Sequence, residues 1–67
     1  MRMVQADTLL STYKDESLMA VTFVVDGQYG TRYYNNKVWV ADEIYEGHSE
    51  EYAENAAENY VLGVKTI

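Results

Sequence analysis

Residues 41–60 are rich in side chains that carry negative charge and contain no lysine or arginine. The seven carboxylates of this segment are Asp42, Glu43, Glu46, Glu50, Glu51, Glu54 and Glu58. Residues 1–37 hold four acids and four bases, whereas residues 38–67 hold these seven acids and only Lys65. The whole net charge of −6 therefore comes from the second part of the chain. Such an imbalance indicates either a partner of opposite sign or a solvated surface that maintains solubility.

The first interpretation predicts a surface that binds a basic region of another protein. Charge speeds the encounter of two proteins, and aromatic rings add contact area. We expect all seven carboxylates to contribute, together with three nearby aromatic residues: Trp39, Tyr45 and Tyr52. The sign of the charge excludes direct binding of nucleic acid through this surface. The segment carries one charge per about 3.6 Å, close to the ~3.4 Å of a single nucleic-acid strand and sparser than the ~1.7 Å of a duplex, so mimicry of nucleic acid stays open.

A carboxylate metal site is an alternative use of the same residues. Four oxygen or nitrogen ligands lie close together in the sequence: Asp42, Glu43, Glu46 and His48. Their spacing does not follow that of a calcium-binding loop, and a histidine between a glycine and a serine is typical of an exposed loop. We therefore expect neither a metal nor a cofactor.

Enzymatic activity is not indicated. The chain has one histidine, no cysteine and no glycine-rich phosphate loop or nucleophile motif. A chain of 67 residues also has little room for a deep pocket that excludes water. We expect a protein that is not an enzyme.

Aromatic residues in the middle of the chain raise the question of base stacking on an exposed sheet. Tyr33, Tyr34 and Trp39 lie near Arg32 and Lys37. A sheet that binds RNA needs a basic surround and a different aromatic spacing. Because this part of the chain is only neutral, we expect these rings to cover the core and the sheet edges.

The elements that must position these residues begin with two strands. Residues 17–25 form a run of β-branched and aromatic residues, and residues 31–41 form a second run rich in Tyr, Val and Trp. Asp26-Gly27 between them predicts a hairpin, because glycine supplies the positive φ that a tight turn needs. Residues 3–13 are predicted as a further strand, with a short helix capped by Asp7 as the alternative.

A helix should follow the strands. Ser49 is a favourable N-cap, and Gly63 is a typical residue just beyond a helix end. Apolar residues recur with helical spacing at Tyr52, Ala53, Ala56, Ala57, Tyr60 and Val61. The glutamates of this segment are expected on the side opposite that stripe, and the alanines should let the helix approach the sheet closely.

Residues 64–67 are long enough for a closing strand. The expected order is β-β-β-α-β, or α-β-β-α-β if the N-terminal segment is helical. Either order gives a single α+β domain over residues 1–67, in which one amphipathic helix packs on a small antiparallel sheet of three to four strands. No apolar run is long enough to span a membrane, so we expect a soluble cytoplasmic protein. A core this small also favours self-association, which is the alternative function: a structural module whose acidity only maintains solubility.

The element order and the segment HSEEYAENAAENYVLGVKTI resemble small phage-encoded inhibitors of bacterial RNA polymerase. The resemblance covers residues 20–67 and consists of a sheet, an acidic amphipathic helix and a final strand. It implies a compact acidic protein that acts on a host nucleic-acid-handling protein by steric or electrostatic occlusion.

Overall fold

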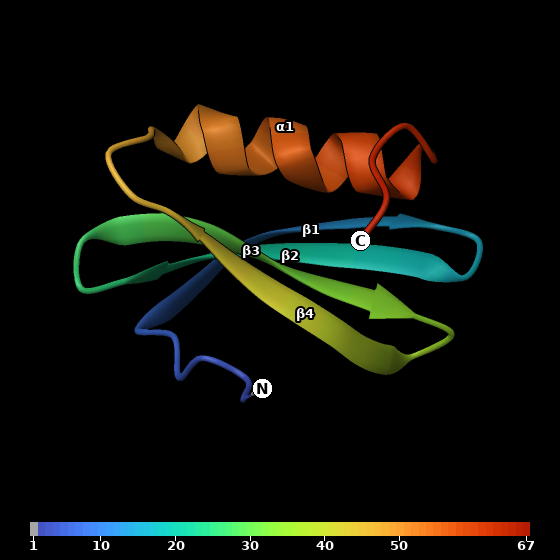
Figure 1. The fold of residues 1–67 in the computed structure, drawn as a ribbon, viewed down its shortest axis with the longest axis horizontal. Helices are drawn as coiled ribbons and strands as arrows, with labels where there is room; N and C mark the ends of the chain where they lie inside the picture. The colour runs from blue at the N-terminus through green and yellow to red at the C-terminus, as the bar shows by residue number, and fades with distance from the viewer. Residues whose placement is uncertain (1) are drawn as a thin grey trace.

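The computed structural model describes residues 2–67, which form a four-stranded antiparallel sheet with a helix on one face (Figure 1). The elements in chain order are β1 (Thr8–Asp15), β2 (Leu18–Val25), β3 (Gln28–Asn35), β4 (Val38–Tyr45) and α1 (Glu50–Val61). The strands lie side by side in the order β1-β2-β3-β4, so β1 and β4 are the edge strands. This arrangement confirms the α+β class. Among the described residues, no helix has the length and apolar composition that a membrane crossing requires.

The predicted order β-β-β-α-β is wrong, because α1 follows all four strands. Residues 64–67 do not form the expected closing strand. Gly63 has a φ of +81°, and the N–H groups of Val64 and Lys65 then donate to the carbonyl of Asn59 at 2.9 and 3.0 Å. These bonds fold the chain back at the end of α1 instead of extending it. Ser49 precedes α1 as predicted, although its side chain makes no capping hydrogen bond.

A second tight turn divides the segment that was predicted as one strand over residues 31–41. Asn36 and Lys37, with φ of 53° and 68°, join β3 to β4. Asparagine tolerates this left-handed conformation, but lysine adopts it rarely, so the pair is a weak turn signal. The hairpin predicted at Asp26-Gly27 is confirmed, with φ of 49° and 74°.

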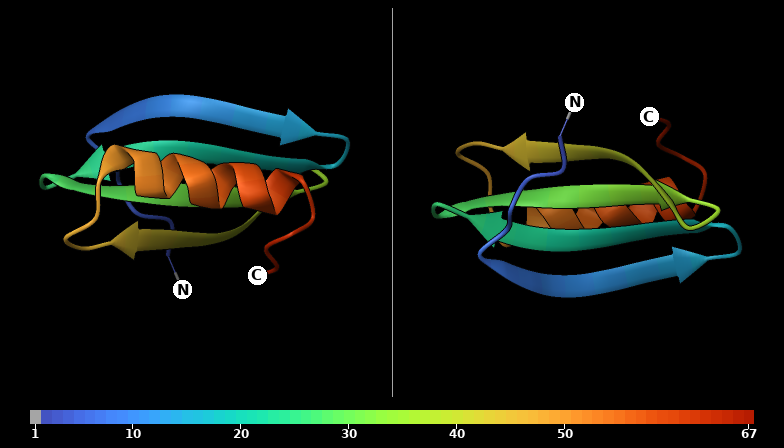
Figure 2. Two further views of the ribbon diagram at one scale, coloured as in Figure 1. Left: turned by 90° about the horizontal axis from the view of Figure 1, so that it is seen from above. Right: turned by 90° about the horizontal axis from the view of Figure 1, so that it is seen from below.

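The N-terminal segment is part strand and part irregular chain. The strand predicted over residues 3–13 is confirmed only from Thr8 onward, where β1 begins. We call residues 2–7 the N-terminal strap, because they cross the face of the sheet that α1 leaves open (Figure 2). The N–H group of Asp7 donates to the carbonyl of Val24 at 2.9 Å, and the N–H group of Val4 donates to Asp42 on β4 at 2.6 Å. The strap therefore runs from the β1 end of the sheet towards β4.

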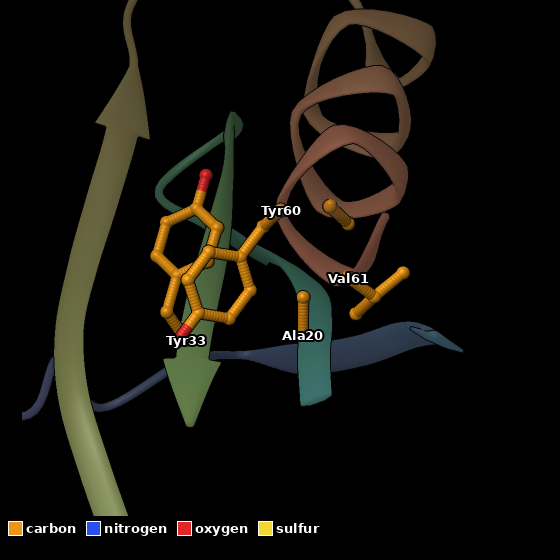
Figure 3. Packing of buried hydrophobic residues seen from close by; sticks show 5 residues of the cluster. Ala20, Tyr33, Tyr60 and Val61 are labelled. Carbon is orange, nitrogen blue, oxygen red and sulfur yellow. The ribbon is translucent and has the colours of Figure 1, made fainter. Parts of the chain in front are cut away.

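The core lies between α1 and the sheet and is built around two tyrosines (Figure 3). The rings of Tyr33 on β3 and Tyr60 on α1 meet edge to face, with their centroids 4.7 Å apart. Ala53 and Ala57 are fully buried on the same side of α1, as expected for small residues that let the helix approach the sheet, whereas Ala56 is only half-buried. The hydroxyl of Thr31 accordingly reaches the backbone and donates to the carbonyl of Ala53 at 2.8 Å.

The open face has a smaller packed region beneath the strap. Phe23 is fully buried there and its ring lies over Gly30, where a Cβ atom would be 2.6 Å from the Phe23 ring. The same Cβ atom would be 2.5 Å from the carbonyl oxygen of Glu43. Glycine is therefore required at this position by the close approach of its neighbours and not by its φ.

Candidate functional site

Three of the four glutamates of α1 lie on the flank of the helix that faces β1. Burial raises the pKa of the Tyr13 hydroxyl on β1, and the charges of Glu54, Glu58 and Glu50 raise it further. A single residue of β1 is thus close to three glutamates that recur every fourth residue and form one row along the helix. The prediction that they lie opposite the apolar stripe is wrong, because Glu50 and Glu54 are half-buried beside it. With the exposed Glu51 they form what we call the acidic flank: Glu50, Glu51, Glu54 and Glu58.

Like charges are held close together within the acidic flank. The pKa of Glu54 is raised, first by a hydrogen bond with Glu50 and then by partial burial and the charge of Glu50. A hydrogen bond with Tyr13 acts in the opposite direction and lowers the pKa of Glu54. The pair therefore concentrates negative charge at one point above β1, at a cost to the folded state.

Ion pairs distinguish the acids of β4 from those of α1. Two ion pairs occur among residues 2–67, Arg32–Asp42 at 2.9 Å and Lys65–Glu43 at 3.3 Å. Both of these acids belong to β4. In the same part of the chain, the other five acids of the predicted surface make no ion pair: Glu46, Glu50, Glu51, Glu54 and Glu58.

Asp42 is the centre of a hydrogen-bond network on the open face. Its oxygens accept from Nε of Arg32 and from the indole N–H of Trp39, both at 2.9 Å, and from the Val4 N–H. Arg32 also donates to the carbonyl of Val4. Burial alone would raise the pKa of Asp42, but the hydrogen bonds from Arg32, Trp39 and Val4 together lower it. Asp42 therefore attaches the strap to the sheet, and Trp39 is one of its donors, so we leave both out of the binding surface.

Glu43 occupies a second network on the helix-covered face. The Tyr45 hydroxyl donates to Oε1 of Glu43 at 2.6 Å. The Tyr33 hydroxyl then donates its one hydrogen to the Tyr45 oxygen and lies 3.2 Å from the same Glu43 oxygen. Burial raises the pKa of both tyrosines. Burial would raise the pKa of Glu43, but the Tyr45 hydroxyl and the charge of Lys65 lower it. This carboxylate is satisfied within the chain, so it too is left out of the binding surface.

Tyr52 lies on the opposite flank of α1 from the glutamate row. Its ring packs edge to face on Tyr45, with centroids 5.1 Å apart, and stacks on His48 at 3.8 Å. Tyr52 is 46% exposed and Glu46 is exposed in the loop before the helix. The predicted surface is therefore divided into an acidic flank beside β1 and an aromatic group beside β4, and the structure does not join them.

The described residues include shallow hollows but no preformed metal centre. No group of three or more His, Cys, Asp or Glu side chains in residues 2–67 is placed to hold a metal ion. A hollow of about 400 Å³ lies at the turn end of the sheet. Its lining is Lys14, Glu16, Ser17, Met19, Asn36 and Lys37. A second hollow, of about 320 Å³, lies between Tyr45 and Tyr52 and extends to Lys65.

Comparisons of the chain with protein-family models, with curated proteins and with solved structures found no match. The closing strand that the resemblance to phage inhibitors implied is also absent from residues 64–67. The candidate binding surface is therefore defined from the geometry of the chain itself.

Sequence reasoning missed three residues that organise these sites. Tyr13 was considered only as part of the N-terminal element, yet it is the β1 residue beside the glutamate row. Arg32 was considered only beside the aromatic residues and Lys65 only as the one base of residues 38–67, yet each pairs with one acid of β4. The signal for Tyr13 was its alternation with Ser11, which puts both on one face of β1, but the pairs of Arg32 and Lys65 depend on tertiary contacts.

Proposed function

We propose that this protein binds a basic surface of another protein through the acidic flank and blocks that surface. The observation that supports the proposal is the row of carboxylates on α1, which has no ion pair in the described chain and contains the mutually repelling pair Glu50 and Glu54. Lysine or arginine side chains of a partner would relieve this repulsion on binding. The row would therefore contribute more to the complex than to the free protein.

Glu46, Tyr45 and Tyr52 remain in the proposed surface as a secondary contact. Tyr52 offers a partly exposed ring that is already held between Tyr45 and His48, so little conformational entropy would be lost when it is covered. A partner wide enough to cross the outer side of α1 would reach both this group and the acidic flank.

The proposed mechanism is occlusion. The resemblance to small phage inhibitors suggests a host nucleic-acid-handling protein as the partner, since such proteins present the basic surfaces that acidic residues complement. A protein with a Cα radius of gyration of 10.7 Å would act by covering such a surface, and the acidic flank would set the rate of encounter.

A matched pair of charge reversals tests this proposal. Glu51→Lys changes an exposed residue of the acidic flank, and Glu16→Lys makes the same change of charge at an exposed residue in the β1–β2 turn. Wild type and both variants would be immobilised, the proteins captured from host lysate identified, and each purified partner titrated from about 0.05 M to about 0.5 M salt. We expect Glu51→Lys to weaken binding about tenfold and Glu16→Lys to change it little, with affinity falling as salt rises. Equal binding by the two variants, or binding that is indifferent to salt, would refute the proposal.

A self-associating module is the second candidate, and the edge strand β4 favours it. Four apolar side chains on or beside this strand are partly or largely exposed: Val38, Val40, Ile44 and Ile67. A second copy could cover them. Molar mass measured by light scattering across a concentration series tests this candidate directly, because a monomer at every concentration would exclude it.

A further inference from the structure

Within residues 2–67, the outer edge of β1 has no neighbouring strand. β1 is the first strand of the sheet, and it pairs only with β2. Both ends of the described chain lie away from it: the N-terminal strap reaches Asp42 on β4, and the C-terminal tail reaches Glu43 on β4 (Figure 2). A row of backbone N–H and C=O groups along β1 is therefore free to pair with another chain.

Only part of this edge is regular. The register of β1 on β2 shifts between Leu9 and Ser11, so Leu10 is the extra residue of a β-bulge. From Ser11 to Asp15 the pairing continues without a shift as far as the turn. Because backbone groups alternate in direction along an antiparallel strand, Thr12 and Lys14 should direct theirs outward. The usable edge is thus a short stretch of about five residues.

The charge beside this edge differs between the helix-covered face and the open face of the sheet. On the helix-covered face, α1 packs against β1, and Tyr13 of that strand lies close to Glu50, Glu54 and Glu58. On the open face, alternation places Thr12 and Lys14, which offer no negative charge. A strand added to β1 would therefore meet acids on one of its faces and a neutral to basic surface on the other.

This charge distribution decides between a second copy and a basic partner. Pairing β1 with β1 of another copy about a two-fold axis would bring two acidic flanks together on the joined sheet, which like-charge repulsion disfavours. Lysine or arginine at alternate positions of an incoming strand would instead reach the glutamates while the intervening side chains faced away.

We propose that β1 accepts an extended segment of a basic partner as an added edge strand, in which lysine or arginine alternates with uncharged residues. The inference rests on the proposed function and specifies its partner: main-chain hydrogen bonds to β1 would provide affinity, and the acidic flank would select the alternating pattern. A partner with the same charge in another arrangement would be attracted but would not pair.

Two capped peptides of equal composition test the pattern. In the first, KTKVKTK, lysine alternates with threonine or valine; in the second, KKKKTTV, the lysines are contiguous. Both carry the same charge, so attraction to the acidic flank alone would give them equal affinity. We expect the alternating peptide to bind at least about tenfold more tightly in isothermal titration or fluorescence anisotropy at low salt. Equal affinities would refute strand addition and leave the proposed function standing.

N-methylation of the alternating peptide tests the backbone bonds while the protein stays unchanged. The lysine residues direct their N–H groups to one edge of the peptide strand and the intervening residues direct theirs to the other. Methylating the set that faces β1 should abolish the tighter binding of the alternating peptide, and methylating the other set should not. Which of the two sets is sensitive shows whether the added strand runs parallel or antiparallel to β1. If both methylated peptides bind as the parent does, strand addition is refuted. If neither starting peptide binds and the natural partner is also indifferent to Glu51→Lys, the proposed function fails as well.

Discussion

The two edge strands of this sheet have equal lengths and similar irregularities, but they are integrated into the molecule in different ways. Each has eight residues and one shift of register, at Leu10 in β1 and at Val40 in β4. Asp42 of β4 accepts a hydrogen bond from Val4 near one end of the described chain, and Glu43 of β4 forms an ion pair with Lys65 near the other. In residues 2–67, no side chain of β1 forms an ion pair with either end, and the acids beside β1 have no ion pair at all.

The comparison shows that the same kind of residue has opposite roles on the two sides of one small domain. On β4, carboxylates with lowered pKa values hold the fold together. Beside β1, a carboxylate with a raised pKa is held against a like charge. Removal of an acid should therefore destabilise the protein on one side and stabilise it on the other.

The largest expected effect is at Asp42. Asp42→Ala leaves the Arg32 guanidinium, which is mostly buried, without its charged partner, and we expect a loss of about 3 kcal/mol in the free energy of unfolding. Urea unfolding followed by circular dichroism would measure it. Thr12→Ala, on the exposed outer part of β1, is the matched control and should change stability by less than about 0.5 kcal/mol. Similar losses from both variants would remove the distinction between the edges.

The next effect concerns the packing between β3 and β4. Gly30→Ala would place a Cβ atom 2.5 Å from the carbonyl oxygen of Glu43 and 2.6 Å from the Phe23 ring. Because one of these neighbours is backbone, β4 must shift, and we expect a loss of about 2 kcal/mol in the free energy of unfolding. Tryptophan fluorescence should change as well, since Trp39 lies on β4. An unchanged unfolding midpoint would show that the β4 backbone can shift to accommodate the Cβ atom without loss of stability.

The elements that follow from periodicity or from turns containing glycine were predictable from the sequence, and the contacts that distinguish the two edges were not. The helical spacing of Ala53, Ala57 and Tyr60 and the β-branched run of β2 each reflect local burial. Because the turn at Asn36-Lys37 lacks glycine, the sequence did not predict that a separate strand, β4, begins after it. Without β4 and its register, the pairs that satisfy Asp42 and Glu43 could not be predicted either. A contact such as Val4 with Asp42 joins distant segments and leaves no local pattern.

A smaller effect is expected at Tyr45, within the network of the helix-covered face. Tyr45→Phe removes the hydroxyl that donates to Glu43, with a loss of about 1 kcal/mol in the free energy of unfolding. Tyr52→Phe is the control, because it keeps the ring and changes only a hydroxyl on the exposed side of α1. If the two substitutions have equal effects, the network around Glu43 contributes nothing of its own.

The smallest effect is at Glu54 and has the opposite sign. The pKa of Glu54 is higher in the folded state than in the unfolded state, where it is about 4.3. Glu54 therefore favours folding at pH values below its unfolded-state pKa, and this contribution is lost as the pH rises through its folded-state pKa. Glu54→Gln should therefore raise the urea midpoint slightly at pH 7, and the gain should disappear below about pH 4.

Glu43→Gln provides the contrast to Glu54→Gln. Because the pKa of Glu43 is lowered, its stabilisation is present above about pH 4.3 and is lost as the pH falls through the folded value. This variant should therefore be less stable than wild type at pH 7 and should converge with it in acid. Unfolding midpoints measured across this pH range for both variants would show whether the two signs differ as expected.

The hydrogen bond between Val4 and Asp42 also has a kinetic meaning, because it closes a loop across 38 positions of the chain. The three hairpins need only neighbouring residues and can form early, whereas this contact must wait until β4 is in place. The strap precedes all four strands in the chain but would thus be among the last segments to dock, and we expect it to bind to a sheet that has already formed.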